Sequence, residues 1–297
     1  MTPAPRVAFI GLGIMGLPMA RNLRAAGFSV VGHNRSPARA TEFAGGGGET
    51  SDTIQGAVVG ADVVALMLPD SPDVEQVLTG PDGVFGQVRP GTLVIDFSTI
   101  HPDVARAMAE EGVRVGVEVL DAPVSGGEPG AVEGSLSIMV GGSDHAFESA
   151  SDVLNAVGRT IVHVGPAGAG QTVKAANQLI VAGTIELVAE SMALLEASGL
   201  DVAAALQVLK GGLAGSAVLE RKSGAMTRRD YAPGFRLDLH HKDLGIALDV
   251  ARERGVATPL GALTAQLVAA LVAQGKGNRD HSALFALVEE LSGRDAD

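Results

Sequence analysis

Short apolar runs alternate with amphipathic stretches through the first half of the chain. The runs have the length of buried strands, and the stretches between them repeat apolar residues every three to four positions, as helices do. We predict strands at Arg6–Ile10, Ser29–Gly32, Asp62–Leu68, Leu93–Phe97, Val117–Leu120, Leu136–Val140 and Thr160–Val164, and helices at Leu17–Ala26, Ser71–Leu78, Pro102–Glu111 and Asp144–Val157. This alternation is typical of a mostly parallel, doubly wound sheet, which binds ligands beyond the carboxyl ends of its strands.

The strand pattern stops near Gly165, and the remaining periodicity is helical. We predict a long helix over about 170–198 and then helices at Asp201–Leu209, Ser216–Met226, Leu237–Arg254, Leu260–Gln274 and His281–Leu291, with Asp201 and Asp280 as caps. The predicted fold class is therefore α/β. A sheet domain over residues 1–165 is followed by an all-α domain over residues 166–297, and the long helix joins them.

The long helix carries few charges: from Thr160 to Ile185 the single formal charge is Lys174. Asn177 and Gln178 follow Lys174 at i+3 and i+4, so the ammonium and two side-chain amides share one face. Val173, Ile180 and Leu187 lie on another face, which we expect to pack within the chain or against a second subunit. A lone lysine on such a helix either extends its ammonium to water or takes part in chemistry, and the segment alone leaves both open.

The composition narrows the classes of protein. The 297 residues suffice for two domains, and 46% of them are hydrophobic. The net charge of −12, without a basic stripe, argues against nucleic-acid and membrane-surface partners. The absence of cysteine excludes disulfides and thiolate catalysis, and because H-x₃-H spacing does not occur we expect no metal site. With no signal-peptide pattern or membrane-spanning run, we expect a soluble cytoplasmic protein.

A glycine-rich motif follows the first predicted strand and opens the first predicted helix. It reads G-x-G-x-x-G, and its glycines permit a tight turn, close approach of a pyrophosphate and close helix packing. The strand–turn–helix context favours a dinucleotide site over an unrelated glycine-rich turn. The predicted site residues are Gly11, Leu12, Gly13, Ile14, Met15 and Gly16.

The end of the second predicted strand bears on which nucleotide binds. NAD sites usually place an acid there, but this chain has Asn34, Arg35 and Ser36, and the first acid after the glycine motif is Glu42. Arg35 and Ser36 can hold a 2′-phosphate, which an acid would repel. We therefore predict that Asn34, Arg35 and Ser36 bind the cofactor and that NADP is preferred, with NAD possible. The alternative is that Arg35 is a solvated loop residue.

Two further strand ends are polar. Ser98-Thr99 follows one strand, and Ser125-Gly126-Gly127 follows another. A hydroxyl beside two glycines can present several donors to a carboxylate, although a flexible turn would show the same residues. A serine-hydrolase interpretation is disfavoured because the G-x-S-x-G pattern is absent around Ser125.

Four segments together resemble one family. They are the glycine motif, Asp121–Gly127 (DAPVSGG), the G-x-G-x-x-x-K-x-x-N pattern that ends in Lys174 and Asn177, and Lys242–Leu244 (KDL). In order and spacing they resemble the β-hydroxyacid dehydrogenases over nearly the whole chain. The resemblance implies a Rossmann-type NAD(P)-binding domain, a C-terminal domain similar to that of 6-phosphogluconate dehydrogenase, and a homodimer or homotetramer.

The resemblance also implies an activity, the interconversion of a small β-hydroxy acid and its semialdehyde by hydride transfer. Lys174 would be the general acid or base, and Asn177 would orient Lys174 or the substrate. Ser125, Gly126 and Gly127 would hold the substrate carboxylate. The further cofactor contacts would come from Leu68, Pro69 and Thr99 at the nicotinamide end and from Phe235 and Lys242 in the helical half, with Asp243 as a partner. Lys242 could instead pair with Asp238 four residues earlier.

The substrate is less constrained than the reaction. Ser125–Gly142 and Pro233–Leu244 resemble the branch that reduces tartronate semialdehyde to glycerate, but Gln178 stands where many members have a second Asn. Oxidation of 3-hydroxyisobutyrate and reduction of succinic or glyoxylic semialdehyde therefore remain alternatives. Lys174 argues against the imine reductases, which lack it. A non-catalytic dinucleotide-binding module is the competing class, and the presence of Lys174, Asn177 and Ser125 argues against it.

Overall fold

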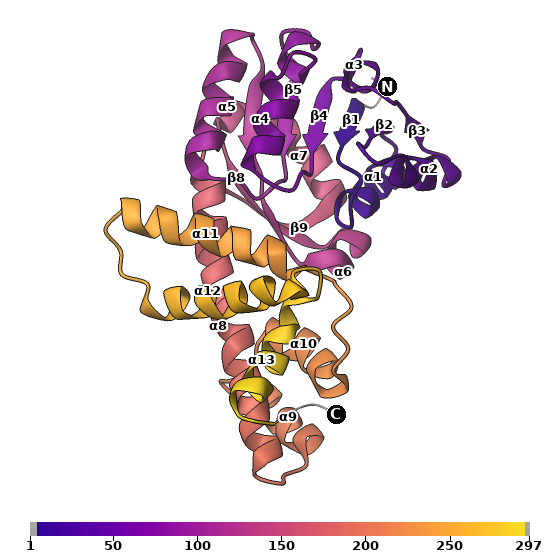
Figure 1. The fold of residues 1–297 in the computed structure, drawn as a ribbon. Coiled ribbons are helices and arrows are strands. Elements are labelled where there is room, and N and C mark those ends of the chain that lie inside the picture. Colours follow the sequence, from indigo (N-terminus) through magenta and orange to yellow (C-terminus); the bar gives the residue numbers. More distant parts are fainter. Residues whose placement is uncertain (1–4, 295–297) are drawn as a thin grey trace. The chain divides into compact units, whose positions relative to one another are not determined.

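The computed structural model describes residues 5–294 and divides into two compact units (Figure 1). Unit 1 is Met1–Lys174 and unit 2 is Ala175–Asp297. Unit 1 holds all the strands that the described residues form, and unit 2 is helical. This agrees with the predicted fold class, a sheet domain followed by an all-α domain.

Unit 1 is built on one sheet with the order β3-β2-β1-β4-β5-β6-β8-β7, and β9 pairs with β8. Pairing is parallel from β3 to β6, whereas β8 runs antiparallel to β6 and β7. The strands are β1 Arg6–Ile10, β2 Ser29–His33, β3 Glu49–Thr50, β4 Val63–Leu66, β5 Leu93–Asp96, β6 Glu118–Asp121, β7 Val124–Ser125, β8 Leu136–Gly141 and β9 Gly158–Gly165. The predicted doubly wound sheet is thus confirmed, with an antiparallel addition at one edge.

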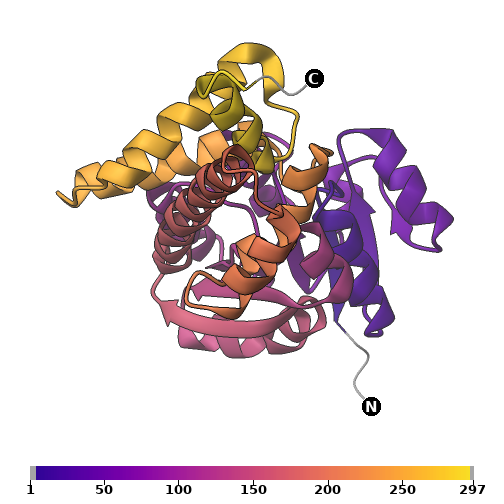
Figure 2. The same cartoon turned by 90° about the horizontal axis from the view of Figure 1, so that it is seen from below.

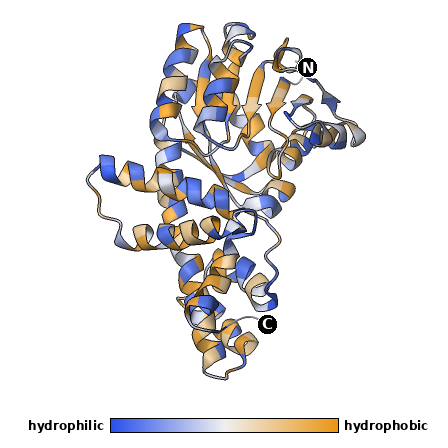
Figure 3. Ribbon diagram, viewed as in Figure 1, coloured by the Kyte–Doolittle hydropathy of each residue, from blue (hydrophilic) through white to orange (hydrophobic). Residues whose placement is uncertain are grey.

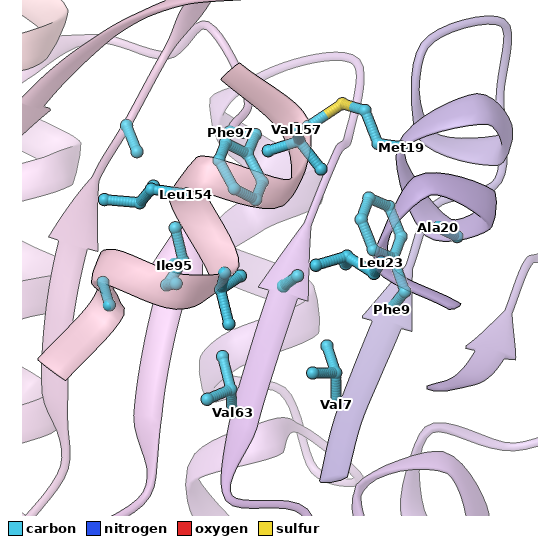
Figure 4. Packing of buried hydrophobic residues seen from close by; sticks show 14 of the residues in the cluster. Val7, Phe9, Met19, Ala20, Leu23, Val63, Ile95, Phe97, Leu154 and Val157 are labelled. Atoms are coloured by element: carbon cyan, nitrogen blue, oxygen red, sulfur yellow. The ribbon is translucent and has the colours of Figure 1, made fainter. Parts of the chain in front are cut away.

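Helices cover both faces of this sheet, and the two-residue repeat of each strand divides its side chains between them. Val7 and Phe9 join the cluster beneath α1 and α7, which Figure 4 shows, while Ala8 and Ile10 join the cluster beneath α3, α4 and α5. The strands are accordingly the most uniformly hydrophobic part of unit 1 (Figure 3). The helices of unit 1 are α1 Gly16–Ala25, α2 Pro37–Gly45, α3 Ile54–Val58, α4 Ser71–Thr79, α5 Pro102–Arg114, α6 Gly127–Glu133 and α7 Asp144–Val157, with a 3-10 turn at Val84–Gly86.

Several short elements were not predicted: α2, α3, α6, β3 and β7. The most consequential is α6, because it begins directly after Ser125 and Gly126. Its sequence, GEPGAVE, contains two glycines and a proline, which are turn signals in a local pattern. Proline is tolerated there because it stands in the first helical turn.

The long helix α8 spans Ala169–Ala197, close to its predicted range. The unit boundary, however, falls after Lys174 rather than after residue 165. The first turn of α8 hydrogen-bonds to unit 1, since Asp121 accepts from the backbone amides of Gly168 and Gln171. These contacts make the beginning of the helix part of unit 1.

For the α8 face with Val173, Ile180 and Leu187 we expect packing within the chain or against a second subunit, and the first of these alternatives is wrong. Val173, Ile180 and Leu187 are 39%, 71% and 51% exposed among the described residues. The face that packs in unit 2 is instead formed by Ala182, Ile185, Ala189 and Met192. By length and composition α8 could also cross a membrane, but half of the qualifying stretch is buried in the structure, and a core helix passes the same test.

Unit 2 continues with α9 Val202–Gly211, α10 Ala217–Arg228, α11 Leu237–Glu253, α12 Pro259–Leu271 and α13 Leu284–Leu291. α11 and α12 lie side by side as an antiparallel pair (Figures 1 and 2). α12 passes into a wider turn at Val272–Lys276, where Gly275 has φ of 77°, and α13 is preceded by a 3-10 turn at His281–Ala283. The predicted caps are confirmed: Asp201 accepts from the amides of Ala203 and Ala204, and Asp280 accepts from that of Ser282.

Candidate active site

The three glycines of the motif between β1 and α1 have different surroundings. Gly11 has φ of 99°, and a Cβ there would collide with the carbonyl oxygen of Met67. A Cβ at Gly16 would collide with the carbonyl oxygen of Gly11, so these two glycines are required by the fold itself. A Cβ at Gly13 would meet nothing within 4 Å. Open space at the start of α1 fits a pyrophosphate, which needs close approach to backbone amides.

The predicted ribose and phosphate contacts at the end of β2 separate into two kinds. Asn34 accepts from the amide of Leu12 at 2.8 Å and donates to the carbonyl of Ser36 at 2.9 Å. Asn34 therefore links the glycine loop to the segment that follows β2. The side chain of Arg35 is 90% exposed, with its guanidinium 3.6 Å from a carboxylate oxygen of Asp73, and Ser36 is also exposed. Arg35 and Ser36 thus present donors at the carboxyl end of β2.

The ends of β4 and β5 lie next to each other, because Leu66 pairs with Asp96 in the sheet. The amide of Leu68 donates to the hydroxyl of Ser98 at 2.8 Å. The Leu68 side chain also lies against the glycine loop, within contact distance of a Cβ placed at Gly11. The same sheet edge therefore carries the predicted dinucleotide site and the residues that follow β4 and β5. These residues include Leu68 and Pro69 after β4, and Thr99 after β5.

Lys174 is buried in unit 1 beside the Ser125 turn. Lys174 is 6% exposed, and its Nζ donates a hydrogen bond to the carbonyl oxygen of Val124 at 2.8 Å. The alternative in which this ammonium extends to water is therefore wrong. Ser125 follows Val124, and Gly126 and Gly127 have φ of 145° and 63°. Two successive positive φ values, which glycine adopts without strain, bring the chain back into α6 at this point.

Two buried polar residues anchor the helix that carries Lys174. Asp121 Oδ1 accepts from the amide of Gly168 at 2.7 Å, and Oδ2 accepts from that of Gln171 at 2.9 Å. Burial raises the pKa of Asp121 to about 6, against the lowering effect of these hydrogen bonds. The Gln171 side chain accepts from the amide of Ile100 and donates to the carbonyl of Ser98. α8 is thereby joined to the end of β5.

Sequence reasoning assigned no role to Asp121 or Gln171. The only local signals are that Asp121 begins the DAPVSGG segment and that Gln171 precedes Lys174 by three residues, on the same helix face. Their partners are far away in sequence, so the pattern alone does not reveal them.

In unit 2, side chains from α8 and α11 form a continuous chain of contacts. Asn177 Nδ2 donates to Gln178 Oε1 at 2.7 Å, and Gln178 Nε2 donates to Asp243 Oδ2 at 2.6 Å. Asp243 Oδ1 lies 2.9 Å from Lys242 Nζ. Asp238, which sequence offers as an alternative partner of Lys242, has its Oδ1 3.4 Å from Arg236 Nε.

Phe235 lies just before α11 in a second polar group of unit 2. Its ring meets the rings of His240 and His281 edge-on, with centroids 5.6 and 5.4 Å away, and its amide donates to Asp280. Burial raises the pKa of Asp280, but His281, Lys222 and hydrogen bonds outweigh it and lower the pKa to about 2. The Asp280 carboxylate therefore holds the backbone at Phe235 through a hydrogen bond from its amide.

The adjacent histidines lie in different surroundings, His240 buried and His241 exposed, as expected for neighbouring positions on a helix. Across residues 5–294, no three or more His, Cys, Asp or Glu side chains gather as the ligands of a metal would.

The open glycine cradle and the buried lysine beside a Ser-Gly-Gly turn define an NAD(P)-dependent oxidoreductase. Comparisons with known proteins agree. Residues 6–165 match the family described as the NAD binding domain of 6-phosphogluconate dehydrogenase. Residues 168–288 match the family described as NAD-binding of NADP-dependent 3-hydroxyisobutyrate dehydrogenase. The chain belongs to the β-hydroxyacid dehydrogenase family.

Individual relatives span nearly its whole length. 2-Hydroxy-3-oxopropionate reductase of Escherichia coli is 40% identical, over 97% of this chain and 98% of that protein. NAD-dependent L-serine dehydrogenase of Pseudomonas aeruginosa is 38% identical, over 97% and 99%. Among solved structures, Mycobacterium tuberculosis 3-hydroxyisobutyrate dehydrogenase with L-serine has a TM-score of 0.86 at 34% identity, covering 96% of this chain and 99% of that one.

Proposed function

We propose that this protein uses NADPH to reduce a small semialdehyde acid, 2-hydroxy-3-oxopropionate (tartronate semialdehyde), to the corresponding hydroxy acid, glycerate. The observation that carries the proposal is the buried ammonium of Lys174, 2.8 Å from the carbonyl that precedes Ser125. A cation held there can meet an aldehyde oxygen while the neighbouring turn binds a carboxylate. The 40% identity to 2-hydroxy-3-oxopropionate reductase supports this choice of substrate.

Each site residue has a separate role in the proposed reduction. NADPH, when bound, supplies the hydride. The hydroxyl of Ser125 and the backbone of Gly126 and Gly127 hold the substrate carboxylate, which orients the aldehyde. Lys174 Nζ donates a proton to the aldehyde oxygen as the carbonyl π bond breaks, leaving a neutral amine that regains a proton from water. In the reverse direction the neutral amine accepts the hydroxyl proton, and Asn177 orients the substrate.

The proposed cofactor preference is supported by the residues at the end of β2. Gly11, Gly13 and Gly16 form the cradle for the pyrophosphate, while Arg35 and Ser36 present exposed donors suited to a 2′-phosphate. NADP is therefore the proposed preferred cofactor, with NAD as the weaker one. In unit 2, Lys242 and Phe235 are the proposed further contacts to the cofactor.

Lys174→Ala tests the catalytic assignment. Removing a general acid is expected to lower turnover by about 100-fold or more, while NADPH binding persists because the glycine cradle is untouched. The measurements are NADPH oxidation with 2-hydroxy-3-oxopropionate and NADPH binding by fluorescence titration. Lys210→Ala, a lysine on α9 paired with Glu220, is the control and is expected to leave both unchanged. Undiminished turnover in Lys174→Ala would sink the assignment.

The same assay distinguishes the alternatives. The panel contains the semialdehydes of tartronate, methylmalonate and succinate together with glyoxylate, and L-serine is assayed in the oxidative direction. The values of kcat/KM rank these substrates. Preference for methylmalonate or succinate semialdehyde would favour a 3-hydroxyisobutyrate dehydrogenase or a succinic semialdehyde reductase. Tight NADPH binding without turnover of any member would instead support a non-catalytic module.

A further inference from the structure

The chain of contacts from Asn177 to Lys242 has a defined hydrogen-bond direction. It lies wholly within unit 2, and its two central members, Gln178 and Asp243, are each 3% exposed. A carboxylate accepts hydrogen bonds and donates none. Asp243 uses one oxygen for the Lys242 ammonium at 2.9 Å and the other for Gln178 at 2.6 Å. The carboxylate therefore determines which end of the Gln178 amide faces it.

Because Asp243 accepts, Gln178 turns its Nε2 toward the carboxylate and its Oε1 toward Asn177. That oxygen in turn accepts from Asn177 Nδ2 at 2.7 Å. The Asn177 amide is thereby oriented with its NH₂ group toward the protein and its carbonyl oxygen Oδ1 away from the chain of contacts. Asn177 is half-buried, in contrast to the buried Gln178 and Asp243.

We propose that Gln178 and Asp243 are positioning residues that make Asn177 a hydrogen-bond acceptor for a hydroxyl group of the substrate. This inference rests on the proposed function, and it narrows the substrate to semialdehyde acids with a hydroxyl on the carbon between the carboxylate and the aldehyde. 2-Hydroxy-3-oxopropionate carries that hydroxyl and 3-oxopropionate lacks it. A site built to bind a substrate hydroxyl discriminates against the analogue without it, because its own polar group then loses a partner.

The charged surroundings of Gln178 make a sensitive test possible. On α11 it faces Asp243, which pairs with Lys242, and on its own helix Lys174 precedes it by four residues. The neighbouring helix α12, whose Gly261 lies against Leu179, has no titratable residue in Pro259–Leu271. A carboxyl group at position 178 would therefore lie against the Asp243 carboxylate, whose other oxygen pairs with Lys242.

Gln178→Glu is the main variant. When protonated, its carboxyl group reproduces the native direction: the O–H donates to Asp243 and the C=O accepts from Asn177. When ionised, it places two carboxylates against each other, and the Asn177 amide loses its orientation. The variant is expected to approach wild-type kcat/KM for 2-hydroxy-3-oxopropionate at acid pH and to fall, as pH rises, to about one tenth of the wild-type value measured at the same pH. Gln207→Glu, at an exposed position on α9, is the matched control and is expected to keep the wild-type profile.

The second readout is selectivity. In Gln178→Leu and Asp243→Asn, the hydrogen bonds no longer set the orientation of the Asn177 amide at any pH. Each is expected to lower the kcat/KM ratio of 2-hydroxy-3-oxopropionate to 3-oxopropionate by about tenfold, mainly through KM for the hydroxylated aldehyde. Asp249→Asn, an exposed carboxylate of α11 paired with Arg252, is the control and is expected to keep the ratio.

The outcomes separate the two proposals. A wild type that reduces both aldehydes, together with a wild-type pH profile in Gln178→Glu and an unchanged ratio in Gln178→Leu, overturns the inference and leaves the proposed function standing. A wild type that reduces neither aldehyde overturns the proposed function and the inference with it. Should Gln178→Leu fail to fold, the pH profile of Gln178→Glu still decides.

Discussion

Arg35 is the residue on which the proposed preference for NADP depends. Its side chain is 90% exposed at the carboxyl end of β2, where an acid would instead favour the ribose hydroxyls of NAD. In Arg35→Asp the new carboxylate would repel a 2′-phosphate, so NADPH affinity is expected to fall at least about tenfold while NADH affinity changes little. Fluorescence titration with both nucleotides measures the two dissociation constants.

The control for Arg35→Asp is Arg159→Asp, a charge reversal at an exposed position on β9, which is expected to alter neither affinity. Equal weakening of NADPH and NADH by Arg35→Asp would show that Arg35 is not a ligand of the 2′-phosphate. Asn34, its neighbour, also holds the glycine loop, because its amide oxygen accepts from Leu12 and its NH₂ group donates to the carbonyl of Ser36.

At the scale of elements, the turn from β1 to α1 allows a matched pair of substitutions. Gly13→Ala adds a methyl group to open space, so the melting temperature is expected to stay close to that of the wild type while NADPH binding weakens about tenfold or more. Gly16→Ala forces a methyl group onto the carbonyl of Gly11 and is expected to cost about 1–3 kcal/mol of stability. Thermal unfolding and NADPH titration of both variants check the pair, and the reverse pattern would contradict these roles.

The regular elements were largely predictable from sequence, because β1, β4 and β5 are short continuous apolar runs and α5 and α7 repeat apolar residues every three to four positions. α6 was not, since Gly127, Pro129 and Gly130 give a turn pattern that tertiary packing overrides: Gly130 and Ala131 are buried. The unpredicted helix matters because it determines how the chain leaves the Ser125 turn. The length of α8 was predicted, but which of its faces is buried in unit 2 was not.

At the scale of the whole molecule, the exposed face of α8 bears on the homodimer or homotetramer that the family resemblance implies. Ile180, Leu187 and Leu194 recur every seven residues and are 71%, 51% and 68% exposed. A seven-residue apolar repeat on a helix can pack against a second copy of itself. We propose this face as an interface between two copies, and Leu187→Glu is expected to lower the molar mass measured by light scattering. Val162→Glu, equally exposed at 51% on β9, is the control, and an unchanged mass in Leu187→Glu would refute the interface.

The sequence by itself determined the main strands and helices, the glycine motif and the isolation of Lys174 on an apolar helix, because each is encoded by neighbouring residues. It also determined the family, through the order and spacing of four short motifs. Tertiary structure alone decided that Lys174 is buried against Val124, fifty positions away, and that Asp243 directs the Gln178 amide across sixty-five positions. Hydrogen-bond direction depends on which donor meets which acceptor in space. Local periodicity records only which face a side chain occupies, so it carries no information about such distant partners.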